Sequence, residues 1–167
     1  MKNTLVTVTV VFLFCSTLMA QGDDASTRKS LKGILGVWVV IEPLDPDAER
    51  TELSRNAIQT DVELRLRMAG IAILPGDKTL AWMRGGPALY IVVHTHKRGE
   101  LYAFSYSIGL YQRVKLDREP QISLFASTWG GEGLGSVGSA NLSQIRNRIK
   151  DAVDKFINAW LSVNPKP

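Results

Sequence analysis

Residues 88–129 read ALYIVVHTHKRGELYAFSYSIGLYQRVKLDREPQISLFASTW. Within this stretch, runs rich in Val, Ile, Tyr and Phe occupy residues 88–96, 101–116 and 122–129, and short polar segments separate them. β-branched and aromatic runs between turn residues are typical of strands joined by hairpins. The stretch therefore predicts a meander of three antiparallel strands.

One helix is expected before this meander in the sequence and one after it. Residues 51–70 contain no Pro, carry two neighbouring apolar arcs at a helical period, and end at Gly70, a residue suited to a left-handed helix cap. Residues 142–163 place an apolar side chain at every third or fourth position. Further strands are predicted at residues 35–44 and 71–74.

The first helix has an alternative interpretation. Residues 62–68 alternate between apolar and polar side chains, which would also fit a strand. The longer window over residues 51–70 favours the helix. In a helix, Asp61 and Arg65 lie one turn apart, which predicts an ion pair within the helix.

The predicted order is β-α-β-β-β-β-α. The two predicted helices are amphipathic, and each needs a surface on which to bury its apolar side. We expect both to pack on the same face of the sheet. We therefore expect one α+β domain over residues 34–167, a two-layer sandwich whose sheet is largely antiparallel. Residues 21–33 are polar and are predicted to form a tether.

The N-terminus has the composition of an export signal. Lys2 precedes an apolar run of about eleven residues, too short for the ~20 residues of a membrane span, and Ala20 is a small residue suited to cleavage. We expect a periplasmic or secreted protein, which touches a membrane only through residues 1–20 if they are not removed. Phe14 stands before Cys15, where a lipoprotein signal needs a small residue.

Composition excludes several classes of function. Cys15 is the only cysteine, so without residues 1–20 the chain has no disulfide, thiol nucleophile or Cys-ligated metal. The net charge of +4 is small and dispersed along the chain, unlike the clustered basic face of a nucleic-acid-binding protein.

Strand alternation assigns the two faces of the meander. Pairing of His96 with Leu101 places Leu89, Ile91 and Val93 on an apolar face for the helices. The opposite, open face would carry aromatic side chains over small residues, with Trp129 opposite Gly109. This arrangement predicts a docking platform, although Trp129 could merely cover Gly109. The candidate binding residues are Tyr90, Tyr111, Phe125, Trp129, Gly133 and Gly135.

Gly133 and Gly135 belong to a glycine-rich segment, residues 130–138, which is predicted to be a flexible connection beside Trp129 that could close over a ligand. The segment matches the Gly-x-Gly-x-x-Gly pattern of dinucleotide-binding loops. That fold needs a further parallel strand with an acidic residue, and here the chain ends with the helix. Dinucleotide binding is therefore not expected.

His94 and His96 point to the same side of one strand, a spacing that can hold zinc. With no other histidine and no cysteine, a third protein ligand would have to be a carboxylate such as Glu100. No other cofactor is expected. Two solvated histidines near a hairpin end are the simpler interpretation.

The segments Gln59-Thr60-Asp61-Val62-Glu63-Leu64-Arg65-Leu66-Arg67 and Thr128-Trp129, with the final helix ending Val163-Asn164-Pro165, resemble small exported bacterial proteins of unknown function. The element order is also similar to α+β modules of envelope assembly, such as the lipopolysaccharide-assembly lipoprotein and the amino-terminal domain of TolB. That similarity is one of architecture and implies no activity.

No set of a nucleophile and a base is recognisable, so no catalytic residue is assigned. We expect a non-enzymatic exported domain that binds a protein, a glycan or a small apolar ligand, or that assists envelope assembly, through the open sheet face and the glycine-rich segment. The alternatives are a metal-dependent enzyme that uses His94 and His96, and a carrier of a small ligand.

Overall fold

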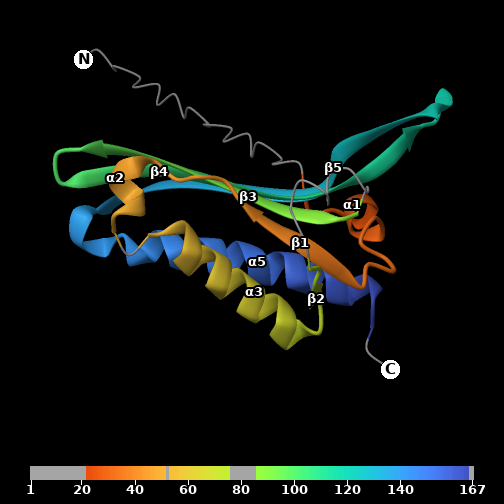
Figure 1. Ribbon diagram of the computed structural model, residues 1–167, viewed down its shortest axis with the longest axis horizontal. Coiled ribbons are helices and arrows are strands. Elements are labelled where there is room, and N and C mark those ends of the chain that lie inside the picture. The colour runs from red at the N-terminus through yellow and green to blue at the C-terminus, as the bar shows by residue number, and fades with distance from the viewer. Residues whose placement is uncertain (1–21, 52, 76–85, 166–167) are drawn as a thin grey trace, which may run out of the picture.

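The structure, a computed structural model, describes residues 22–51, 53–75 and 86–165. The predicted signal at residues 1–20 and most of the predicted loop at 75–87 lie outside these residues. The described strands form one sheet in the order β2-β1-β3-β4-β5 (Figure 1). The strands are β1 (Gly36–Ile41), β2 (Ala72–Ile73), β3 (Ala88–Arg98), β4 (Leu101–Leu116) and β5 (Glu119–Gly138).

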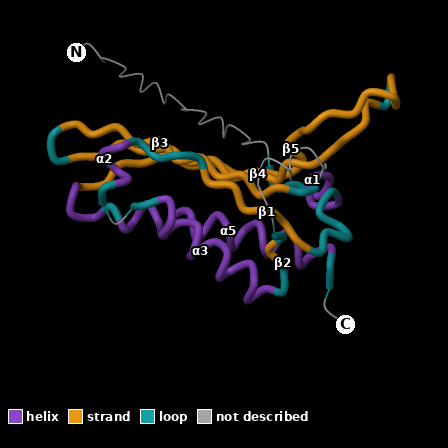
Figure 2. Tube along the Cα trace, in the orientation of Figure 1, coloured by secondary structure: helices purple, strands orange, loops and turns teal. Residues whose placement is uncertain are grey.

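Helices α3 (Arg55–Ala69) and α5 (Ser143–Val163) pack on one face of this sheet (Figure 2). β1 runs parallel to β2 and β3, whereas β3, β4 and β5 are antiparallel to one another. The α+β class, the two layers and the predicted order are confirmed, with short helices added. The helices are α1 (Ala25–Lys29), α2 (Pro46–Glu49), α3 (Arg55–Ala69), a 3-10 turn η1 (Ser139–Asn141) and α5 (Ser143–Val163).

The core lies between the sheet and these two helices. In α3 one of the two predicted apolar arcs, that of Ile58, Val62 and Leu66, is buried, and Gly70 ends the helix in the left-handed conformation at φ 88°. The sheet presents the side chains predicted for the helix face. On this face of β3 and β4 the buried side chains are Leu89, Ile91, Val93, Tyr102, Phe104, Ile108 and Leu110.

The β3–β4 hairpin is tighter than predicted. Arg98, rather than His96, pairs with Leu101, and the turn holds Gly99 at φ 60° and Glu100. The register therefore differs from the prediction by two residues. A shift of two leaves every side chain on its predicted face, which is why the face assignment survives the error.

β5 is much longer than predicted, because residues 130–138 form a strand rather than a flexible connection. The first half of β4 supplies hydrogen-bonding partners along this segment. The ring of Tyr106 covers Gly133 and the ring of Phe104 covers Gly135, and an added Cβ would lie 2.6 Å and 2.9 Å from these rings, respectively. Glycines here leave room for aromatic side chains from the neighbouring strand, a use that the sequence pattern did not reveal.

A β-bulge moves Trp129 to the other face of the sheet. Tyr111 pairs with Ser127 as predicted, but Leu110 pairs with Trp129, so Thr128 is an extra residue in β5. One extra residue inverts the alternation beyond it. Trp129 is consequently 2% exposed and packs edge-to-face on Phe156 of α5, with a centroid distance of 5.2 Å. The prediction that it lies on the open face opposite Gly109 is wrong.

The predicted tether contains α1 and packs on the domain. The indole Nε1 of Trp129 donates to the Asp23 carboxylate at 3.2 Å, and Leu31 is fully buried. Asn164, at the end of α5, accepts a hydrogen bond from the Gly33 amide and donates one to the Leu31 carbonyl. Residues 22–33 thus close the end of the core beside β5.

The burial of Trp129 makes a stability prediction. Trp129→Ala should lower the free energy of unfolding by about 3–5 kcal/mol, because it removes a large side chain from between β5 and α5. Phe125→Ala, on the projecting end of the same strand, is the matched control and should lower the free energy of unfolding by about 1 kcal/mol or less. Urea denaturation measures both, and equal small losses would contradict the inward position of Trp129.

Candidate functional site

Only some of the predicted binding residues lie on the open face of the sheet. No helix of the described part of the chain covers its centre, which apart from Leu134 is lined by small and polar side chains. Trp129 has left this face, and Gly133 and Gly135 lie beneath rings on the helix side. The exposed residues at the centre are His94, His96, Ala103, Ser105, Ser107, Glu132, Leu134 and Ser136.

The predicted aromatic residues do not form a single platform. Tyr90 and Tyr111 meet edge-to-face at a centroid distance of 5.6 Å. Phe125 lies on the outer part of the β4–β5 hairpin, which projects beyond the helices (Figure 1), where the guanidinium of Arg113 is 5.9 Å from its ring centroid. The open face is therefore polar, with one aromatic pair at its end.

Tyr90 is tied to the neighbouring strand. Its hydroxyl donates a hydrogen bond to the Glu42 carboxylate, just beyond β1. This bond is the largest cause that raises the pKa of Tyr90 to about 12, with burial second. A hydroxyl held in this way stabilises the sheet and does not act as a base at neutral pH.

The two histidines are exposed and line separate hollows. His94 lies beside Ser105 and Glu132 in a hollow of about 250 Å³, whereas His96 lies beside Asp45 in one of about 330 Å³. Asp45 accepts from the Thr95 amide at 2.7 Å, and this bond lowers the pKa of Asp45. Within the described ranges, no group of three or more His, Cys, Asp or Glu side chains could hold a metal ion.

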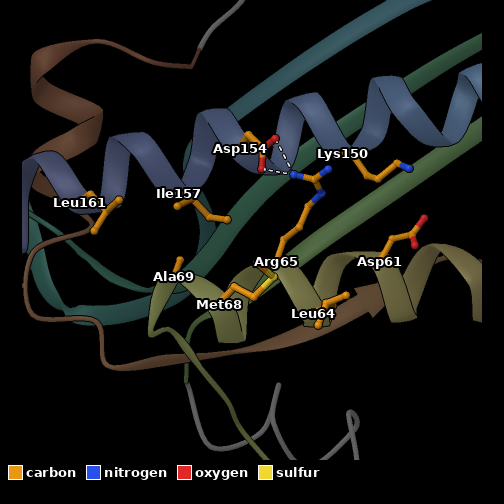
Figure 3. A pocket seen from close by; sticks show the side chains of 9 residues that line it. All are labelled: Asp61, Leu64, Arg65, Met68, Ala69, Lys150, Asp154, Ile157 and Leu161. Carbon is orange, nitrogen blue, oxygen red and sulfur yellow. Dashed lines mark hydrogen bonds and ion pairs between the residues drawn. The ribbon is translucent and has the colours of Figure 1, made fainter.

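A larger, mainly apolar hollow lies in a groove between α3 and α5, on the side away from the sheet (Figure 3). Its volume is about 630 Å³. Leu64 and Met68, members of the second apolar arc of α3, are 55% and 75% exposed along it. We name this feature the α3–α5 groove; its lining residues are Asp61, Leu64, Arg65, Met68, Ala69, Lys150, Asp154, Ile157 and Leu161.

Ion pairs between the helices hold the groove in shape. Arg65 donates from Nη1 to both carboxylate oxygens of Asp154 at 2.7 Å, and Arg146 donates to Asp61 at 2.7 Å (Figure 3 draws the first pair). The predicted pair of Asp61 with Arg65 within α3 is therefore wrong, because each side chain finds a partner on α5. Lys150 lines the groove and forms none of the ion pairs among the described residues.

No site was predicted in this groove from the sequence. The sequence did contain a signal for it, because residues 51–70 carry two apolar arcs. A helix that packs on a sheet buries only one apolar stripe, so the second arc is left for another contact. The arrangement can bind an apolar group at the Leu64–Met68 end and an anion near Lys150.

Comparison with known proteins gives one distant structural neighbour to report. A point variant of PelC from Paraburkholderia phytofirmans, solved as a dodecamer, is similar over 75% of this chain and 90% of its own, with 14% sequence identity and a TM-score of 0.41. No protein-family model matches the chain, and neither does any curated protein. No family is assigned, and the resemblance to small exported bacterial proteins stays a prediction.

Across residues 22–51, 53–75 and 86–165, no helix combines the length and the apolar character that a bilayer span requires.

The Tyr90–Glu42 bond predicts a pH dependence. The folded-state pKa of Tyr90, about 12, exceeds the ordinary value of 10.0. The stabilisation is therefore fully present below pH 10 and is lost as the pH rises towards 12. Ultraviolet titration should show a tyrosine ionisation near pH 12, which Glu42→Gln moves towards pH 10. Glu132→Gln, which removes an exposed carboxylate elsewhere on this face, should leave that titration unchanged, and an equal effect of both variants would contradict the assignment.

Proposed function

We propose that the protein is an exported, non-catalytic binding domain that holds an apolar segment of a partner protein in the α3–α5 groove. The observation that supports this is the exposure of Leu64 and Met68, side by side on α3 and facing apolar residues of α5. Export is supported by the composition of residues 1–20. The proposal keeps the binding role expected from the sequence but moves its site from the sheet to the helices.

Burial of these side chains supplies a driving force. Covering a Leu or Met side chain fully is worth about 1.5–3 kcal/mol, and two adjacent ones give the centre of an interface. Met is flexible and polarisable, so Met68 can adapt to the shape of a bound segment. Ile157 and Leu161 extend the apolar surface across to α5.

The chemistry of the groove favours an amphipathic helix as its occupant. The groove follows α3 from Asp61 to Met68, about 10 Å at the rise of a helix, which matches two turns of a partner helix. It is bounded by only two helices, whereas a small ligand needs enclosure on most sides. Lys150, beside paired charges, would face an acidic residue of the partner. We therefore infer a helix with apolar residues at i, i+3 or i+4, and i+7, followed by an acidic residue.

The test uses a defined probe, a labelled amphipathic peptide helix with Leu at these positions and Glu at the end near Lys150. Fluorescence anisotropy should show binding, and Met68→Lys should weaken it by about tenfold or more, since a buried apolar contact is replaced by a charge. Lys150→Glu should weaken binding of this probe and strengthen binding of a peptide with Lys in place of the terminal Glu.

Ile122→Lys is the matched control, because Ile122 is an exposed apolar residue on the β4–β5 hairpin, away from the groove. It should leave the affinity unchanged. Equal affinities for the Met68 variant and the control would refute the proposal. Binding of a fatty acid that Met68→Lys abolishes, without any peptide binding, would instead assign the groove to a small apolar ligand.

A further inference from the structure

β5 is an edge strand with part of its outer side uncovered. The Gly130 amide donates to the Gly22 carbonyl at 3.4 Å, on the side away from β4. In an antiparallel strand, the N–H and C=O groups of one residue point to the same side, and successive residues alternate. Glu132, Leu134 and Ser136 therefore also direct their backbone groups outward from the sheet.

None of the described residues protects these outward groups. Within the described part of the chain, Glu132, Leu134 and Ser136 make no hydrogen bond outside the sheet, and the cover provided by α1 and Gly22 stops at Gly130. Leu134 is 87% exposed. Edge strands usually carry several charges, a Pro or a covering element that prevents pairing, whereas this segment offers one charge, at Glu132, and glycines on either side of Leu134.

A row of polar side chains on α5, which alternate in charge from Arg148 onwards, runs beside this edge. Gln144 and Arg148 line a small hollow with Leu134 and Ser136. Burial raises the pKa of Tyr106, and the charges of Arg148 and Asp151 lower and raise it, respectively. The ring of Tyr106 lies over the β5 residue Gly133. Lys155 continues the row one turn further. At helical spacing, these four α5 residues share the flank opposite the α3–α5 groove.

We propose that this edge pairs with the same edge of a second copy of the chain, antiparallel, about a twofold axis at Leu134. Leu134 then faces Leu134 of the second copy, and Glu132 faces Ser136 of the second copy, so no like charges meet. The row on α5 is self-complementary about the same axis: Arg148 faces Asp151 of the second copy, and Gln144 faces Lys155 of the second copy.

Two independent patterns thus share one centre. The backbone register places the axis at Leu134, and the charge order on α5 places it between Arg148 and Asp151, the first of which lines a hollow with Leu134. Strands in a sheet are spaced about 4.8 Å apart, so two α5 helices beneath the joined edges lie within reach of Arg and Lys side chains. The α3–α5 groove is on the other flank of α5 and stays open, so this inference does not depend on the proposed function.

Cysteine cross-linking tests the register. In protein carrying Cys15→Ser, which removes the chain's one thiol, Leu134→Cys should oxidise to a covalent dimer. Residues facing each other in a hydrogen-bonded pair have Cα atoms about 5.5 Å apart, within disulfide range. Ser136→Cys is the matched control and should remain monomeric under denaturing conditions, because the two Ser136 positions lie about 13 Å apart along the strands. Equal cross-linking of both variants would overturn the register.

Sedimentation equilibrium tests the charge order independently of any cysteine. Arg148→Glu places a carboxylate opposite Asp151 of the second copy and should weaken dimerisation by about tenfold or more. Adding Asp151→Arg restores opposite charges across the axis and should return the affinity to within about threefold of the wild type. A wild-type protein that stays monomeric at every concentration, or a double variant no tighter than Arg148→Glu, would overturn the proposal.

Discussion

The antiparallel ladder between β4 and β5 is the constraint on which the other features depend. Its inner half fixes Trp129, Gly133 and Gly135 on the helix side, and its outer half projects beyond the helices. The single extra residue, Thr128, separates these halves and inverts the side-chain alternation. Without it, the ring of Trp129 would lie in solvent and leave a hole above Phe156. A bulge of one residue therefore decides which half of β5 belongs to the core.

α5 connects the core to both candidate surfaces. One face, including Ile149 and Phe156, packs on the sheet, and a second faces α3 through Arg146 and Asp154. The third face runs along the edge of β5 with Arg148 and its neighbours. The ion pairs between α3 and α5, Arg65 with Asp154 and Arg146 with Asp61, are partly exposed, so each contributes little to stability. Their structural effect is to fix the spacing of the helices and thereby the walls of the α3–α5 groove.

Much of the fold was predictable from local patterns, and the candidate site was not. Alternation at residues 88–116 assigned the two faces correctly even though the hairpin register was off by two, because only odd shifts exchange the faces. The glycines of residues 130–138 suggested a loop, since their role depends on Tyr106 and Phe104 of another strand. The bulge at Thr128 has no local signature, and the partners of Asp61 and Arg65 depend on where α5 packs. Each error concerns a contact between segments distant in sequence.

Amide hydrogen exchange along β5, measured by NMR in dilute protein, tests the β4–β5 ladder most directly. The ladder requires slow exchange at Gly131, Gly133 and Gly135, whose amides point to β4, and fast exchange at Glu132 and Leu134, whose amides point outward. Uniformly fast exchange across residues 130–138 would show that the segment is a loop. The inward position of Trp129, the rings over the glycines and the exposed edge would then all be wrong.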